Sequence, residues 1–296
     1  MMLKRLGKHI LRILPLKRQL FTVVRYFSPP EWVFRHLYFS DWFTVAIEQR
    51  SFLMYHYGHQ LENQVFWKGL DGWEGASMRL WVALSARSRI IIDVGANTGL
   101  FSLVAKTVNP DAEIYAFEPV ERVYRKLRRN IEANRFDIVA ERLGVSNFTG
   151  AGMIYDIPED HVYSVTINKN LNPTDRMVIP TTISVTTLDE YVHSHKLGPV
   201  ELLKIDVETH EPEVLEGARN LIRESRPSML VEVLTQEAAT RIAGILKDLN
   251  YAFFSIDELR GPRLTMAITP NLNQNYLLYA GNPQDVINLW NEEATH

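Results

Sequence analysis

The stretch that decides the fold is Ile90-Ile-Ile-Asp-Val-Gly-Ala-Asn-Thr-Gly99. It opens with an apolar β-branched run bounded by polar residues, a pattern that predicts a buried parallel strand. Gly95 and Gly99 bracket a tight turn, and Thr98 is placed to cap the helix that follows. Glycines there let the backbone bend sharply and let a ligand approach without meeting a Cβ atom. The helix N-terminus offers N–H groups to a carboxylate or phosphate. The stretch predicts a nucleotide-type site or, alternatively, an ordinary strand-to-helix turn.

Length and composition limit the classes of protein that need to be considered. A chain of 296 residues with 46% hydrophobic and 23% charged residues can bury a substantial core. It has room for one large α/β domain with an appendage, or for two small domains. No run approaches the roughly 18 apolar residues of a membrane span. The absence of cysteine excludes disulfides and thiolate metal sites, and it agrees with a cytoplasmic location.

The first 27 residues differ from the rest in charge. They contain seven Lys and Arg residues and no acid, whereas the whole chain carries −3, so the remainder carries −10. Leu3, Leu6, Ile10 and Ile13 recur at helical spacing, which predicts a basic amphipathic helix up to Pro15. Such a helix can lie at an anionic membrane surface, and it also resembles a transit peptide. The alternative is a helix that packs on the rest of the protein or on a partner.

Residues 28–75 are rich in aromatic side chains and are separated from the basic arm by Pro29-Pro30. They form either a cap over a pocket mouth or a simple core. We therefore expect three parts: a basic arm over residues 1–27, an aromatic-rich cap over 28–75, and an α/β domain over 76–296. Residues 150–187 contain short β segments separated by prolines, including Ser164–Ile167, and are expected to form a β insertion beside the strand ends.

A second strand is predicted over Glu113-Ile-Tyr-Ala-Phe-Glu-Pro119, followed by a helix to about Asn134. Glu118 ends this strand about 20 residues after the glycine turn, the position of the acid that binds a ribose diol. The dinucleotide fingerprint requires G-x-G-x-x-G, but the pyrophosphate-facing middle glycine is replaced by Asn97. This favours a ligand with an amino-acid end and disfavours a nicotinamide-dependent oxidoreductase. Arginines on the outer face of the helix lack interleaved aromatics, so nucleic-acid binding is not expected.

The remaining strands bring polar residues to the same edge of the predicted sheet. Strand three, Ile138–Val145, leads to Ser146, and strand four, Glu201–Val207, ends among Lys204, Asp206, Glu208 and His210. Alternate residues share one face of a strand, and ligands of doubly wound sheets bind at the carboxyl ends. The rest of the pattern predicts helices over 211–222 and 237–249, strands over 228–233, 251–256 and 275–280, and a long loop over 260–273.

Four motifs in this order resemble the FkbM family of S-adenosylmethionine-dependent methyltransferases. They are Asp93-Val-Gly-Ala-Asn-Thr-Gly99, Phe117-Glu-Pro119, Thr187-Leu-Asp189 and Lys204-Ile-Asp-Val-Glu208. The resemblance covers about residues 88–235. It implies the class I methyltransferase fold, a doubly wound, Rossmann-like α/β fold with a seven-stranded sheet and a reversed last strand. It also implies O-methylation of a hydroxyl on a small-molecule or glycan acceptor, such as a sugar, a polyketide or another secondary metabolite.

By that resemblance, Asp93, Gly95, Asn97 and Gly99 line the methionine end of S-adenosylmethionine, and Glu118 holds its ribose. We add Thr98, Ser146 and Asp206 to the expected cofactor-binding residues. The family usually continues its last motif as Asp-Val-Glu-Gly, and here Thr209 replaces that glycine. The substitution, together with the basic arm, supports the alternative of a non-catalytic binding or scaffold protein.

Methyl transfer to a hydroxyl needs an aligned oxygen and a base or a metal beside it, because a hydroxyl is a poor nucleophile. His210 is the expected base, and Asp206 and Glu208 complete the expected catalytic set; His210 has the alternative of a helix-capping role. Asp206 and Glu208 could alternatively bind a hard divalent ion through their oxygens, but two carboxylates alone do not predict such a site. His193-Ser-His195 follows a helical stretch in which residues two apart diverge. We therefore expect no metal site, and at most a peripheral membrane contact through residues 1–27.

Overall fold

The computed structural model describes residues 16–156, 179–270 and 274–293. It divides into two compact units, residues 1–73 and residues 74–296, which we describe separately. The predicted helix up to Pro15 and the predicted strand Ser164–Ile167 lie outside the described residues. Within the described residues, no helix is long and apolar enough to cross a bilayer.

The smaller unit is an antiparallel hairpin with helices around it. The hairpin consists of β1 (Asp41–Ile47) and β2 (Arg50–His56), and the other elements are α2 (Lys17–Arg25), α3 (Glu31–Phe34), α4 (Gln60–Lys68) and the 3₁₀ turn η1 (Gly69–Gly72). Its aromatic residues pack against one another. Phe21 of α2 is buried, with its ring centroid 6.2 Å from Phe39 and 5.8 Å from Trp67. The described part of the basic arm therefore contributes to the core of this unit.

The larger unit is built on an eight-stranded sheet with the order β12-β11-β13-β10-β9-β3-β4-β5. The strands of this sheet are β3 (Ile90–Val94), β4 (Glu113–Phe117), β5 (Val139–Glu141), β9 (Leu202–Ile205), β10 (Ser228–Glu232), β11 (Ala252–Asp257), β12 (Gly261–Thr265) and β13 (Asn275–Tyr279). The strands β5, β4, β3, β9 and β10 run parallel, and β13 runs antiparallel to β10 and β11. The predicted sheet with a reversed last strand is confirmed, with one strand added at its edge.

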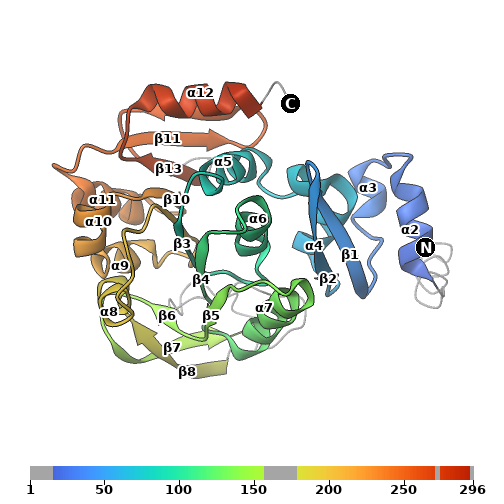
Figure 1. The fold of residues 1–296 in the computed structure, drawn as a ribbon, viewed down its shortest axis with the longest axis horizontal. Helices are drawn as coiled ribbons and strands as arrows, with labels where there is room; N and C mark the ends of the chain where they lie inside the picture. Colours follow the sequence, from blue (N-terminus) through green and yellow to red (C-terminus); the bar gives the residue numbers. More distant parts are fainter. Residues whose placement is uncertain (1–15, 157–178, 271–273, 294–296) are drawn as a thin grey trace. The chain divides into compact units, whose positions relative to one another are not determined.

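Helices cover both faces of this sheet (Figure 1). On one side lie α5 (Gly75–Ser85) and α6 (Leu100–Val108), and on the other lie α8 (Leu188–Ser194), α9 (Glu211–Glu216), α10 (Arg219–Ser225) and α11 (Gln236–Leu246). The remaining helices are α7 (Glu121–Asn134) and α12 (Pro283–Glu293). Ile90, Ile92 and Val94 pack with the α8–α11 side. Because alternate strand residues face opposite ways, Asp93 points to the α5–α6 side.

Three predicted elements differ from those observed. The apolar run 138–145 is not one strand: its end, β6 (Gly144–Val145), joins β7 (Gly150–Asp156) and β8 (Ile179–Thr186) in a separate three-stranded sheet. The helix predicted over 211–222 is split into α9 and α10 at Gly217, whose carbonyl accepts from Asp189 N–H at 2.9 Å and where a Cβ atom would lie 2.0 Å from the carbonyl oxygen of Ser146. The loop predicted over 260–273 contains β12, which forms a hairpin with β11 where the Asp257 carboxylate accepts from Leu259 and Arg260 N–H.

Candidate active site

The glycine turn after β3 is held by the end of the neighbouring strand. The N–H groups of Gly95 and Ala96 both donate to the carbonyl of Phe117, at 3.0 and 2.9 Å. Gly95 has φ +81°, and a Cβ atom there would lie 1.9 Å from the carbonyl oxygen of Asp206. Gly99 has φ +96°, and its Cβ would lie 2.6 Å from Leu127. Both glycines are thus required by the backbone and by packing of the protein itself, a reason that the sequence analysis did not foresee.

Glu118 ties the end of β4 to this turn. Its carboxylate is buried, and it accepts hydrogen bonds from the N–H groups of Asn97 (3.1 Å) and Val120 (2.9 Å). Asn97 has φ +53°, a left-handed conformation that asparagine tolerates better than most residues. The two predicted cofactor residues Asn97 and Glu118 are therefore neighbours in space, and two main-chain bonds fix the orientation of the carboxylate.

Thr98 does not cap the helix as predicted. The helix α6 begins after Gly99, no side chain caps it, and Thr98 is fully buried. The carbonyl of Thr98 accepts a hydrogen bond from Asn130 of α7 at 2.8 Å. Left-handed residues on both sides, Asn97 and Gly99, turn the threonine inward, so Thr98 connects the turn to α7 through its main chain.

Asp93 and Lys204 stand side by side on the α5–α6 face, as register partners on β3 and β9. The Lys204 ammonium donates to the Asp206 carboxylate at 2.8 Å and lies 4.4 Å above the Phe101 ring. Asp93 is 1% exposed, and its Oδ2 accepts from Ser102 Oγ at 2.6 Å. Its Oδ1 is buried and has no hydrogen-bond partner within the described residues. Burial raises the pKa of Asp93, and Lys204 opposes that shift.

Further carboxylates surround Lys204. Glu74 precedes α5 and Glu232 ends β10; burial raises their pKa values to about 7 and about 9, and Lys204 opposes both shifts. The carboxylates of Asp206 and Glu208 raise the pKa of Glu232 further. Burial lowers the pKa of Lys204, but the surrounding carboxylates reverse the shift and raise it overall. No group of histidine, aspartate and glutamate side chains within the described residues is arranged to hold a metal ion.

The turn between β9 and α9 contains two consecutive left-handed residues, Glu208 at φ +54° and Thr209 at φ +77°. Threonine is β-branched, so this conformation is strained at the position where the family pattern has glycine. The buried Glu211 carboxylate holds the turn by accepting from Val207 N–H (3.0 Å) and Thr209 N–H (3.2 Å). Burial raises the pKa of Glu211 to about 7. No sequence pattern had marked Glu211 as a site residue.

His210 lies between a hydroxyl and a carboxylate. Its Nε2 is 2.9 Å from Ser146 Oγ, and its Nδ1 is 3.4 Å from Glu213 Oε2. The Arg241 guanidinium donates hydrogen bonds to the carboxylates of Glu213 (2.5 Å) and Glu216 (2.9 Å). The Glu216 carboxylate also accepts from the Asn147 side chain at 2.9 Å. Burial lowers the pKa of His210, and Glu213 opposes the shift. The structure thus pairs Ser146 with His210, which the sequence had placed in different roles.

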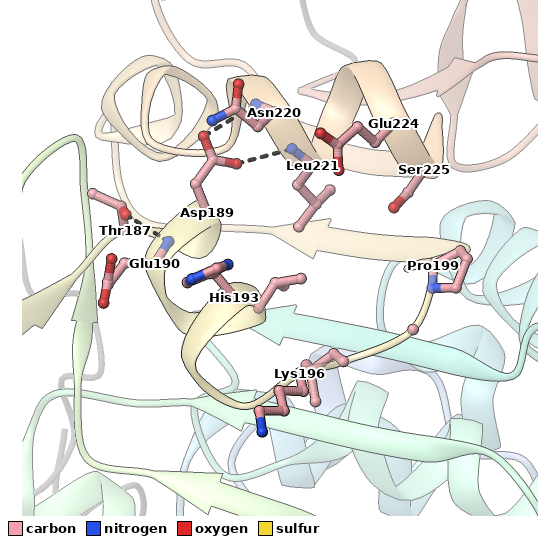
Figure 2. A pocket seen from close by; sticks show the side chains of 13 residues that line it. Thr187, Asp189, Glu190, His193, Lys196, Pro199, Asn220, Leu221, Glu224 and Ser225 are labelled. Atoms are coloured by element: carbon pink, nitrogen blue, oxygen red, sulfur yellow. Dashed lines mark hydrogen bonds between the residues drawn. The ribbon is translucent and has the colours of Figure 1, made fainter.

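The motif Thr187-Leu-Asp189 stabilises helix ends. Thr187 Oγ1 accepts from Glu190 N–H at 3.0 Å, and the Asp189 carboxylate accepts from the N–H groups of Asn220 (3.0 Å) and Leu221 (2.9 Å) at the start of α10 (Figure 2). These residues border a cleft of about 870 Å³ between α8, α10 and the segment before β9. Pro199, which lines the cleft, precedes β9, whereas Asp206 follows its carboxyl end. The cleft and the carboxylate cluster are therefore distinct features.

The carboxylates at the ends of β9 and β10 and the glycine turn after β3 together make one polar edge of the sheet. The model of the methyltransferase FkbM domain matches residues 93–253, which include every predicted site residue. The chain belongs to the FkbM methyltransferase domain family. Its sheet, with β13 reversed between β10 and β11, is the class I methyltransferase arrangement.

Three curated relatives each match less than half of this chain. The methyltransferase sdnD of Sordaria araneosa is 33% identical over 153 residues, 43% of this chain. The hexuronic acid methyltransferase AglP of Haloferax volcanii is 26% identical over 49% of this chain, and the 31-O-demethyl-FK506 methyltransferase FkbM of Streptomyces tacrolimicus is 28% identical over 44%. The chain spans 59%, 56% and 60% of the lengths of these three relatives.

Proposed function

We propose that the chain is an S-adenosylmethionine-dependent O-methyltransferase that acts on a hydroxyl of a sugar, a glycan or a secondary metabolite. The observation that carries this proposal is the bond from Asn97 N–H to Glu118, which sets a carboxylate at the end of β4 beside the turn after β3. The names of two relatives, which mention a hexuronic acid and 31-O-demethyl-FK506, support the acceptor class.

The residues present fit this cofactor. The buried Asp93 Oδ1 lacks a partner within the described residues and can accept from the amino group of the methionine end. Gly95, Asn97 and Gly99 would line the same end, and Glu118 would accept from the ribose hydroxyls. Ser146, Thr98 and Asp206 complete the expected binding residues. When bound, S-adenosylmethionine supplies a methyl group that its positive sulfur already activates.

The protein must then align a hydroxyl oxygen, take up its proton and exclude water. We propose that His210 takes up the proton of the hydroxyl and that Asp206 and Glu208 orient the methyl acceptor beside it. The neutral ring can hold its N–H toward Glu213, which leaves Nε2 as the acceptor that now faces Ser146 Oγ. This neutral form is favoured because burial lowers the pKa of His210. The paired strands β7 and β8 of the insertion are proposed to shape the acceptor pocket.

The test is transfer of labelled methyl from S-adenosylmethionine to a panel of hydroxyl compounds that includes neutral sugars, uronic acids and macrolides. We expect label in an O-methyl ether of at least one class, found by mass spectrometry. Cofactor binding without transfer to any class would favour the non-catalytic scaffold. Reduction of NAD without methyl transfer would favour a nicotinamide-dependent oxidoreductase, the alternative that Asn97 in place of a glycine disfavours.

A second proposal concerns residues 1–27, which we expect to contact an anionic membrane surface. Tyr26 and Phe27 are 86% and 80% exposed at the end of α2, close in sequence to Lys17, Arg18 and Arg25. Aromatic and basic side chains together favour the headgroup region of a bilayer. Association with phosphatidylserine vesicles should fall steeply between 50 and roughly 300 mM salt, because salt screens exposed charges. Association that does not change with salt would instead favour packing through Phe21, which is buried against Phe39 and Trp67.

A further inference from the structure

The carboxylates around Lys204 outnumber the positive charge among them. Lys204 is 3% exposed, and its ammonium donates a hydrogen bond to Asp206. The negative charges of Asp93 and Glu74 also raise the pKa of Lys204. Glu232 lies at the end of β10, directly after Val231, which is the register partner of Ile205. Glu232 is therefore next to Asp206 across the two strands. One ammonium thus has four acidic side chains around it: Asp93 of β3, Glu232 of β10, Asp206 directly after β9 and Glu74 directly before α5.

Glu74 lies near this edge, beside the strand on the other side of Glu232. Asn275 of β13 is the register partner of Glu232, and its side chain is one of the neighbours that lower the pKa of Glu74. Its Nδ2 also donates to Glu258 at 3.2 Å, and Glu258 accepts from Ala76 and Ser77 N–H at the start of α5. Strand pairing therefore places Glu232 beside Asp206, and the bonds of Glu258 hold the start of α5, which Glu74 directly precedes, beside Asn275.

A separate observation indicates that this cluster receives a ligand. The Asp93 side chain is 1% exposed, and its Oδ1 accepts no hydrogen bond within the described residues. It lies on the same face as its partner Lys204. A buried carboxylate oxygen without a donor is costly, so a bound donor that carries positive charge would stabilise it.

We propose that Glu74 and Glu232, together with Asp206, bind the positive charge of the cofactor, so that the protein holds S-adenosylmethionine more tightly than S-adenosylhomocysteine. The inference rests on the proposed function. The two compounds share the ribose, the adenine and the amino-acid end, and differ in the charge of the sulfur. Charge attraction in a partly buried site is several times stronger than in water. Burial raises the pKa values of Glu74 and Glu232, so a positive sulfur beside them also favours their ionised forms, and a neutral sulfur does not.

This preference would favour product release. Methyl transfer forms a C–O bond and breaks a C–S bond, whose electron pair stays on sulfur, while the hydroxyl proton goes to the base. The positive charge beside Glu232 is thereby lost. The carboxylates then face a neutral thioether, and the attraction that held the substrate form no longer holds the product form.

The test is titration calorimetry of the full chain at low salt with S-adenosylmethionine, S-adenosylhomocysteine and sinefungin, in which an amine cation stands in place of the sulfonium. We expect the two cationic compounds to bind at least tenfold more tightly than S-adenosylhomocysteine. In the double variant Glu74→Gln and Glu232→Gln the ratio should fall below about threefold, with the affinity for S-adenosylhomocysteine retained as proof of folding. Glu237→Gln, which removes an exposed carboxylate of α11, is the matched control and should keep the wild-type ratio.

Equal binding of the charged and neutral compounds by the wild-type chain would overturn the inference and leave the proposed function intact. The same holds for a ratio that survives in the double variant. If neither S-adenosylmethionine nor S-adenosylhomocysteine binds, the proposed function fails, and the inference fails with it.

Discussion

The main-chain N–H of Asn97 donates to the carboxylate of Glu118 at 3.1 Å, which joins the turn after β3 to the end of β4. This contact places two predicted cofactor residues, 21 positions apart in the chain, at one point of the sheet edge. This bond holds the turn, and we propose that the same carboxylate also binds the ribose of the cofactor.

Replacing Glu118 by alanine should weaken the binding of S-adenosylmethionine by roughly 1.5–3 kcal/mol, the range for hydrogen bonds to a charged group. Calorimetry measures this directly. The control is Glu121→Ala, which removes an exposed carboxylate three residues later and should leave the affinity unchanged. An unaltered affinity in Glu118→Ala would show that Glu118 does not bind the ribose.

Replacing His210 by glutamine should lower turnover by about 10²–10⁴, the usual contribution of a general base, with little change in cofactor affinity. The base must be neutral to accept a proton, and burial lowers the pKa of His210. The wild-type rate should therefore fall only when the pH drops below about 6.5, and this acidic limb should be absent from the variant. Turnover near that of the wild type would show that His210 is not the base and that its contacts with Ser146 and Glu213 are structural.

Replacing Thr209 by glycine should raise the free energy of unfolding by about 0.5–1 kcal/mol. A side chain in the left-handed region costs about 1–2 kcal/mol, and the greater freedom of unfolded glycine offsets part of that gain. Urea denaturation measures the change. Thr240→Gly, within helix α11, is the matched control and should lower the stability. A less stable Thr209→Gly would mean that the threonine side chain makes contacts that outweigh its backbone strain.

Replacing Asp189 by alanine should lower the free energy of unfolding by about 0.5–2 kcal/mol, as expected for the loss of a helix cap, because two N–H groups of α10 lose their acceptor. The affinity for S-adenosylmethionine should stay within about twofold of the wild type, since the motif lies apart from the carboxylate cluster. Asp189→Asn retains one acceptor oxygen and should be intermediate. A large loss of cofactor affinity at full stability would place Asp189 in the site.

The positions of the parallel strands could be predicted because each leaves a local pattern, an apolar run followed by a polar residue, whereas the reversed last strand was implied by the family resemblance. Asp93, Glu118 and Asp206 were found from the local pattern, since each lies at the carboxyl end of a strand. The strand β12 left no such pattern, because it contains Pro262 and Arg263 and, among the strands that the structure describes, pairs only with β11. The division of residues 138–145 between two sheets depends on pairing with β8, about 40 positions later, which no local pattern contains.

The roles of individual site residues were harder to predict, because they depend on contacts between distant segments. Gly95 was expected to admit a ligand, yet the carbonyl of Asp206 is what excludes a side chain there. Glu74 precedes an ordinary helix and has no motif around it, so only the folded chain brings it to Lys204. Thr209 is the opposite case, because its departure from the family pattern was visible in the sequence and coincides with a strained φ of +77°.

The most direct test of the account is thermal unfolding with S-adenosylmethionine, S-adenosylhomocysteine and NAD, each compared with the unliganded chain. At about 100 times its dissociation constant, a ligand of the native state adds roughly 2.7 kcal/mol to the free energy of unfolding. The account predicts that both sulfur compounds raise the melting temperature and that NAD leaves it unchanged. Stabilisation by NAD equal to that by S-adenosylmethionine would contradict it.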